Sequence, residues 1–288
     1  TLNALGSIAN VDAVAPTNAR APRGTPDASR LVELGGGDIV VRAGNDIDAG
    51  IYYVERGLGT LEAGRDIVTN STRSPSRNYL TGFVNPEVFD ARTWMPTTLF
   101  AGKARFSVSA RGDVLLGPTT NPFILPAGLN NKFWYKTYFS TYAPESAVRI
   151  ASLGGDITLR HEVVLPTENT ARSMLQVWLE RASLLPTGAN GAAFYQPWLR
   201  LAETSVEPFV SVLALAPPTL DVTAFSGDLN IVGDLTLAPA PTGTLDLLAS
   251  GAINALQPAG LSNIIVPGQS TTVWTSGRLN VSDADPTA

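Results

Sequence analysis

The sequence has no cysteine, a single histidine and few charged residues. The lack of cysteine excludes disulfides, a thiol nucleophile and cysteine-ligated metal sites. Charged residues make up 16% of the 288 residues, whereas a typical globular protein has about 25%. Thr, Ser, Asn and Gly provide the polar surface instead. This composition favours a secreted, β-rich protein over a cytosolic enzyme.

Basic clusters and long apolar runs are also missing. The 20 Lys and Arg stand against 25 Asp and Glu, for a net charge of -5, and this balance argues against nucleic acid or an anionic membrane as a partner. No apolar run reaches the roughly 18 residues of a membrane-spanning helix. The chain starts abruptly at Thr1 without a signal peptide. We therefore expect a segment of a longer polypeptide.

A short unit recurs along the chain: an aspartate followed at once by Ile, Val or Leu. Glycine stands directly before five of the copies and two places before the other two. Glycine can adopt a positive φ at a sharp bend, and aspartate can accept hydrogen bonds from nearby backbone amides there. The unit thus predicts a structural turn that leads into a strand. The seven aspartates are Asp38, Asp46, Asp66, Asp113, Asp156, Asp228 and Asp234.

The spacing of these units indicates a solenoid. Asp46 and Asp66 lie 20 residues apart, which suits one coil of a parallel β-helix, and the flanking residues alternate with the period of two of a strand. A strand-only unit copied along a chain is typical of such stacked coils. We therefore predict an all-β parallel β-helix with an aliphatic interior, formed by Ile39, Val41, Ile47, Ile67, Val114, Ile157, Leu159, Leu229, Ile231, Leu235, Leu237, Leu245 and Leu247.

The repeat is interrupted rather than continuous. Residues 1–30 are predicted to be an extended leading segment, and residues 31–286 one β-helix domain. The apolar stripe of Met174, Trp178 and Ala182 predicts one short helix at 168–185. In a solenoid, insertions leave the coil at its corners and lie on one side. Three are expected, at about 70–103, 118–145 and 161–218.

These units resemble the filamentous-haemagglutinin-like proteins of Gram-negative bacteria, and more narrowly a haemagglutinin-like outer-membrane-associated subgroup. The Gly-Gly-Asp-Ile units at 36–39 and 154–157 carry the likeness. Four longer strings add to it, in the same order: Tyr-Tyr-Val-x-Arg-Gly at 52–57, Pro-x-Ser-Ala-Val at 144–148, Pro-Thr-Gly-x-Leu-x-Leu-Leu-Ala at 241–249 and Ser-Asp-Ala-Asp-Pro at 282–286.

The resemblance implies a right-handed parallel β-helix in a large exoprotein that leaves the cell by two-partner secretion. It implies a secreted or cell-surface location, a structural or adhesive role, and no catalytic site or cofactor. The implied partners are an outer-membrane transporter during export and a receptor or glycan on a host or bacterial surface. Self-association into filaments is a further expectation. The long insertions depart from the regular shaft of the family.

Two motifs suggest ligands but also have structural interpretations. Arg111-Gly112-Asp113 is the tripeptide that integrins bind, yet Gly112-Asp113 is also one of the corner units, and we favour the corner. The repeated aspartates suggest calcium, but the calcium solenoid needs tandem Gly-Gly-x-Gly-x-Asp nonapeptides. Because the aspartates here are mostly 20 or more residues apart in sequence, we expect them to stay separate and to cap turn amides. No metal site is predicted.

A carbohydrate-binding or carbohydrate-cleaving β-helix, such as a polysaccharide lyase or a tailspike-like protein, is the alternative. Cleavage needs carboxylates clustered on one face. The candidate acids fall in or beside the insertions without a shared register, and His161 has no evident partner. The aromatic group that includes Trp134, Tyr135 and Tyr138 could stack on sugars or bind protein. The simpler interpretation is that it covers one side of the coil. The candidate acids are Glu145, Glu162, Glu168, Glu180, Glu203 and Glu207.

Overall fold

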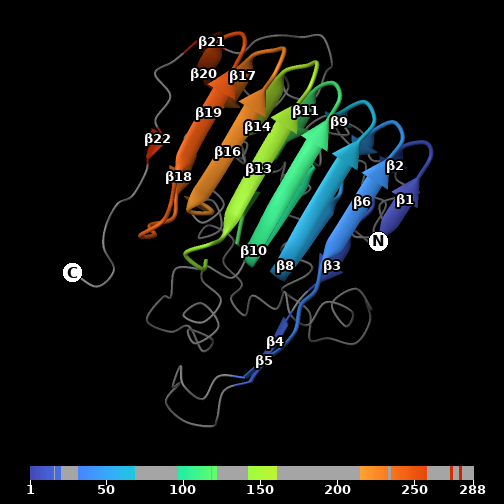
Figure 1. Cartoon of the computed structure of the whole chain (residues 1–288), viewed down its shortest axis with the longest axis vertical. Coiled ribbons are helices and arrows are strands. Elements are labelled where there is room, and N and C mark those ends of the chain that lie inside the picture. Colours follow the sequence, from blue (N-terminus) through green and yellow to red (C-terminus); the bar gives the residue numbers. More distant parts are fainter. Residues whose placement is uncertain are drawn as a thin grey trace, which may run out of the picture.

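The computed structural model describes ten stretches of the chain, and within them every regular element is a β-strand and none is a helix. Most of these strands lie parallel to their neighbours in stacked sheets (Figure 1). The predicted all-β class and parallel arrangement are therefore confirmed. The described residues are 1–15, 17–20, 32–68, 97–117, 119–121, 142–160, 215–232, 235–257, 273–274 and 279–280.

Sheet A runs the length of the molecule. Each of its seven main strands pairs in parallel with the next one along the chain, so sequence order and spatial order coincide. Figure 1 shows them side by side, from blue to orange. The strands are β1 (Leu2–Ala4), β6 (Ile39–Ala43), β8 (Ile51–Ala63), β10 (Thr98–Ala110), β13 (Ala147–Ser152), β16 (Thr219–Ala224) and β19 (Leu245–Ala249).

In sheet B, too, the spatial order of the strands is their order in the sequence. Each of its first seven strands follows a strand of sheet A after one turn of the chain. Its last strand is paired antiparallel and covers the edge of the one before it. The strands are β2 (Ile8–Ala9), β7 (Ile47–Asp48), β9 (Ile67–Val68), β11 (Val114–Leu116), β14 (Ile157–Arg160), β17 (Leu229–Val232), β20 (Ile253–Gln257) and β21 (Val273–Trp274). One sheet A strand, its turn and the following sheet B strand make up a coil. We number the seven coils from β1–β2 to β19–β20.

Short strands form a third side of the coils. Residues 52–54 of β8 pair with β3, and residues 51–54 pair with residues 98–101 of β10. β10 in turn pairs with β12. The long strands β8 and β10 therefore run from the third side of one coil into sheet A of the next. The other strands are β3 (Ala13–Ala15), β12 (Thr119–Thr120), β15 (Leu215–Ala216), β18 (Leu235–Leu237) and β22 (Leu279–Asn280), besides the antiparallel pair β4 (Thr17–Arg20) and β5 (Val32–Gly35).

Inward side chains stack in columns along the coils. One column of sheet A holds Val41, Leu61, Val108, Ile150 and Val222, all buried. Close-packed interiors need complementary sizes, and an added Cβ at Gly59 would collide with the ring of Phe106 in the next coil. Of the predicted interior residues, all are buried except Leu245 and Leu247, which lie in the last coil and are partly buried.

The boundaries differ from the sequence-based expectation at several places. Residues 1–15 form the first coil rather than an extended lead. β10 begins at Thr98, inside the expected first insertion, and β12 and β15 likewise lie inside the other two. Period-two patterns miss these strands because they are short or buried on both faces. The predicted helix at 168–185 lies outside the described residues.

Candidate functional site

A column of aspartates marks the corner between sheets A and B. In each of coils 2 to 5, the Oδ1 atom of the aspartate accepts a hydrogen bond from the backbone N–H of the aspartate in the following coil. The distances are 3.2 Å for Asp46, 2.8 Å for Asp66, 2.9 Å for Asp113 and 2.8 Å for Asp156. At the end of the column Asp228 accepts from Ala252 at 2.7 Å. We call this column the aspartate ladder.

The ladder corrects the expected separation of the aspartates. Its partners are 20, 47, 43 and 72 residues apart in sequence, yet they lie one coil apart in space. Distance along the chain does not separate them, because the described strands of each coil pair in the same register with those of the next. The aspartates do cap backbone amides, but the capped amide belongs to the next coil rather than to the same turn.

The glycines at this corner are required for space rather than for a positive φ. An added Cβ at Gly112, Gly155 or Gly251 would collide with the ladder carboxylate of the preceding coil, and at Gly227 it would lie 2.6 Å from Asp156 Oδ1. None of these four has φ in the left-handed region. The expectation of a positive φ was therefore wrong at this corner. The Gly-Asp pair recurs because each glycine accommodates the previous aspartate.

Two of the seven aspartates do not take part in the described ladder. Asp38 lies at the start of a sheet A strand, where its Oδ1 accepts from Leu58 N–H at 2.8 Å. The preceding Gly37 does have a positive φ, of 136°. Asp234 lies outside the described residues. The corner also begins without an aspartate, because Ser7 Oγ accepts from the Asp46 amide at 3.3 Å.

The Arg111-Gly112-Asp113 tripeptide is part of this corner. Asp113 Oδ1 accepts the Asp156 amide, Gly112 lies against the Asp66 carboxylate, and Arg111 N–H donates to Ala63 O at 3.3 Å. The tripeptide therefore lies flat in the stack, while the Arg111 and Asp113 side chains are exposed. The aromatic candidates Trp134, Tyr135 and Tyr138 lie outside the described residues, as do His161 and all the candidate acids except Glu145.

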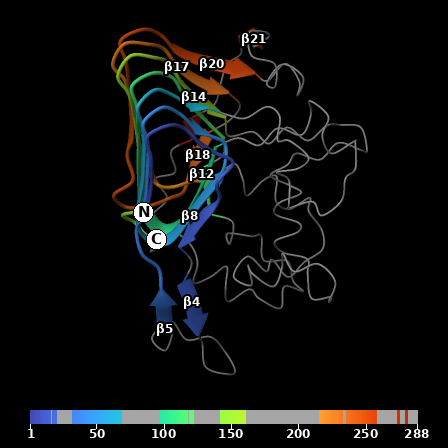
Figure 2. The ribbon, with the colours of Figure 1, turned by 90° about the vertical axis from the view of Figure 1, so that its right-hand side faces the viewer.

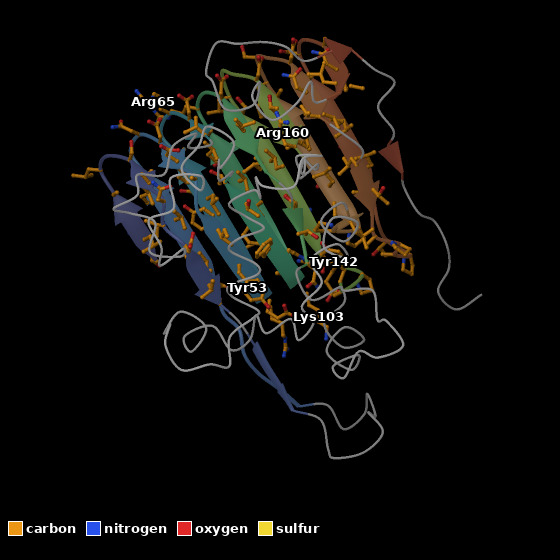
Figure 3. All side chains as sticks on the ribbon, turned by 180° about the vertical axis from the view of Figure 1, so that it is seen from behind. Tyr53, Arg65, Lys103, Tyr142 and Arg160 are labelled. Atoms are coloured by element: carbon orange, nitrogen blue, oxygen red, sulfur yellow. The ribbon has the colours of Figure 1, made fainter. Side chains whose placement is uncertain are left out.

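Within the described part of the chain, ion pairs join neighbouring coils on the surface. Arg42 Nε lies 2.6 Å from Glu62 Oε2, and Arg149 Nε lies 3.0 Å from Asp221 Oδ2. Arg65, labelled in Figure 3, binds Asp46 through its Nε at 2.7 Å and through a second nitrogen. This hydrogen bond lowers the pKa of the Asp46 carboxyl below its usual value, although partial burial acts against it.

An open hollow of about 700 Å³ follows the corner end of sheet A across coils 1 to 5. The bare backbone of Gly44 and Gly64 lines it, and Arg42, Glu62 and Arg111 contribute the charged side chains. An added Cβ at Gly44 would collide with Leu5 O, and at Gly64 with Gly44 O. Glycine is therefore required at these two positions, and it leaves this part of the hollow without side chains.

A second polar cluster is buried on the third side. The Tyr53 hydroxyl donates to Glu55 Oε2 at 2.6 Å, and both residues are almost fully buried. Burial, and then the charge of Glu55, raise the pKa of Tyr53 well above its usual value. Tyr142, near the same end of the coils in Figure 3, donates to Leu215 O at 2.9 Å. The Tyr142 hydrogen bond joins segments that are 73 residues apart in sequence, and sequence reasoning predicted neither of these two hydrogen bonds.

No group of three or more His, Cys, Asp or Glu side chains that could hold a metal ion occurs among the described residues. In the same part of the chain, no helix is long and apolar enough to cross a membrane.

Comparison with known proteins gives no relative. No family model matches the chain, and neither a curated protein nor a solved structure matches it significantly.

Proposed function

We propose that this chain is a rod segment of a large secreted or cell-surface protein of the filamentous-haemagglutinin type. Its coils wind right-handed, as parallel crossover connections almost always do. The rod serves as a scaffold for attachment: it holds the long excursions between its strands at fixed positions along one axis. An outer-membrane transporter would export it, and a receptor or glycan on another surface would bind it.

The aspartate ladder is the observation that carries this proposal. It keeps adjacent coils in register although 47, 43 and 72 residues separate successive aspartates. A backbone amide left without a partner in the stack would cost about 1–3 kcal/mol, so each ladder bond favours one register over its neighbours. A scaffold with this property tolerates long inserts of varied sequence, which suits the presentation of binding loops.

The acids at the hollow and on the third side support this proposal over carbohydrate cleavage. Glycoside hydrolysis uses two carboxylates about 5–10 Å apart. Glu62 is the one carboxylate among the described residues that line the hollow, and it is paired with Arg42. Glu55 is buried against Tyr53. A scaffold needs neither group to react.

The test uses beads coated with the full 288-residue chain. They should be retained on epithelial or bacterial cells, or on defined glycans of an array, without release of new sugar ends. Release of sugar, or retention no better than that of albumin-coated beads, would overturn the proposal.

A matched pair of variants locates the attachment site. The triple variant Trp134→Ala, Tyr135→Ala, Tyr138→Ala removes the aromatic group, and Arg111→Ala removes the arginine of the corner tripeptide. Because Asp113 is held in the ladder, we expect Arg111→Ala to leave retention unchanged. If the rod attaches through the aromatic group, the triple variant should reduce retention at least fivefold. The reverse result would identify the tripeptide as the attachment site.

A further inference from the structure

The last strand of sheet A leaves an open edge. Within the described part of the chain, β19 pairs with β16 alone, and Figure 1 shows it at one end of the row of strands. The inward side chains of β19 are only partly buried, whereas those aligned with them in coil 6 are at most 3% exposed. An edge of this kind presents unpaired backbone groups and an unfinished apolar face, and a further strand would satisfy both.

Two large apolar side chains are exposed at this end of the stack. Leu248, on the outer face of β19, is 58% exposed, and Ile253, the first residue of β20, is 52% exposed. In coil 6 the positions aligned with them hold Thr223 and the fully buried Leu229. Ile253 thus lacks the cover that Leu229 receives from the coil after it.

Asp246 gives the open edge its charge. It is exposed and aligned with Asp221, whose carboxylate lies 3.0 Å from Arg149 Nε of coil 5. Like charges directly opposite each other on adjacent strands destabilise a sheet. A basic side chain on the far side of Asp246 would offset this repulsion, as Arg149 does for Asp221. Arg65 binds Asp46 from the following coil, so a basic residue can take either side of an acid.

Sheet B limits what can cover the last coil. β21 pairs antiparallel with Leu256 and Gln257 of β20, at the edge that would otherwise receive the sheet B strand of a further coil. While β21 is in place, a single extended strand along β19 fits this end better than a complete coil does. Two β19 edges would bring like charges together at Asp246, which disfavours a second copy as the occupant.

We propose that the edge of β19 binds one extended segment of another polypeptide as an added parallel strand. The segment carries apolar residues opposite Leu245 and Leu247 and a basic residue opposite Asp246. In this mode of recognition, backbone hydrogen bonds supply affinity and alternate side chains supply specificity. The inference goes beyond the proposed function, because it concerns the end of the stack and does not depend on what the excursions bind.

The chain itself contains a segment of the required pattern. In β13 the order apolar, basic, apolar is Val148-Arg149-Ile150, and this triplet pairs in parallel with residues 220–222 of β16. A synthetic peptide copying residues 146–153 is therefore the probe. A peptide copying residues 218–225 is the control, because it has the same alternation but aspartate at the charged position.

Disulfide trapping tests the position and direction of the added strand, since the chain has no cysteine of its own. The probe carries Ala151→Cys, two residues after its arginine, and a parallel strand brings this Cys beside Leu248. The full chain with Leu248→Cys should be linked to the probe at least fivefold faster than the chain with Thr244→Cys. Thr244 is the matched control, because it is also exposed and would meet the same Cys in an antiparallel strand.

Three results of this trap would overturn the proposal. They are equal linkage of the two variants, faster linkage of Thr244→Cys, and dimers of the Leu248→Cys chain in preference to the linked probe. The last result would identify a second copy as the occupant.

Charge reversal tests the recognition of the basic residue, with fluorescence anisotropy of labelled peptides as the measurement. The probe should bind the unmodified chain at least threefold more tightly than the control peptide, and Asp246→Lys should reverse this preference. Asn3→Lys adds a positive charge at the opposite end of sheet A and should leave the preference unchanged. Binding of neither peptide, or a preference indifferent to Asp246→Lys, would contradict the proposed site.

Discussion

The aspartate corner and the corner that follows sheet B both reverse the chain sharply, but by different means. At the aspartate corner, a side chain of one coil holds the backbone of the next. After sheet B, the turn depends on backbone conformation: Asn10 and Ala49, which are aligned in coils 1 and 2, have positive φ of 54° and 57°, and Gly50 follows at 112°. We call this the left-handed corner.

The difference shows which part of a coil depends on its neighbours. A left-handed residue can be encoded within one turn, since Asn tolerates that region and glycine favours it. A ladder residue, in contrast, forms its hydrogen bonds with the coils before and after it, so its role depends on both neighbours. Mutations at the aspartate corner should therefore act on pairs of coils, whereas mutations at the left-handed corner should act locally.

The largest effect is expected from a methyl group at the aspartate corner. Gly155→Ala would bring a Cβ to about 2.6 Å from Asp113 N, a backbone atom that cannot rotate away. We expect a loss of about 3 kcal/mol in the free energy of unfolding, measured by urea denaturation. Gly6→Ala is the control, since an added Cβ there meets nothing within 4 Å. Similar losses in both variants would show that space at the ladder is not the cause.

Removal of a single ladder bond should have a smaller effect. Asp113→Ala leaves the Asp156 amide without its acceptor, and the expected loss is about 1–2 kcal/mol. Asp113→Asn keeps an acceptor oxygen at the same position and should recover more than half of this loss. If the asparagine variant is as unstable as the alanine variant, charge rather than the hydrogen bond holds the coils together.

At the left-handed corner a substitution should stabilise the protein. Ala49 has a φ of 57°, which costs an L-residue roughly 1–2 kcal/mol. Ala49→Gly removes this strain but increases the entropy of the unfolded chain by roughly 0.4–1 kcal/mol, so we expect a net gain of about 0.5 kcal/mol. Ala13→Gly, in strand β3, should instead destabilise. A loss with Ala49→Gly would mean that packing of its buried methyl group outweighs the strain.

The smallest effects on stability are expected from changes in pH, and they have opposite signs for the carboxyls of Asp46 and Asp48. The hydrogen bond from Arg65 lowers the pKa of Asp46, so its stabilising contribution is present above the unfolded pKa of about 3.9 and is lost as pH falls through the lower folded pKa. Burial, followed by the charge of Asp46, raises the pKa of Asp48. Its contribution has the opposite sign: stability is lost as pH rises through the folded pKa.

Asp46→Asn should therefore reduce the loss of stability between neutral pH and pH 3, and Asp48→Asn should stabilise the protein at pH 7 more than at pH 3. Thermal unfolding of both variants at the two pH values measures this. The same pH dependence in both variants would contradict the opposite shifts of their pKa values.

Sequence reasoning predicted the parts of the fold that are encoded within one turn. The Asp-aliphatic unit and the alternation around Val41 and Leu159 gave the strands and the interior, and the 20-residue step between Asp46 and Asp66 gave the coil. The unit also placed Gly112-Asp113 at a corner rather than in a projecting loop, and both residues do lie in the ladder.

The remaining features depend on contacts between coils, which a single turn does not reveal. The role of Gly155 is defined by the Asp113 carboxylate of the coil before it, 42 residues earlier in number. The hollow at Gly44 and Gly64 requires knowing that these two residues stack. Tyr142 comes near Glu55, the partner of Tyr53, only when the third side of the coils forms, and the strands of that side carry no repeated motif.

The hydrogen bonds of the ladder all point the same way, from the amide of a later coil to the carboxylate of an earlier one, and Figure 2 shows the coils nested in that order. Each finished coil thus offers a ready acceptor to the segment that comes after it. At Ala252 no acceptor side chain remains at this position. A polypeptide that emerges amino end first could therefore use every completed turn as a template, so that assembly would proceed in one direction along the ladder.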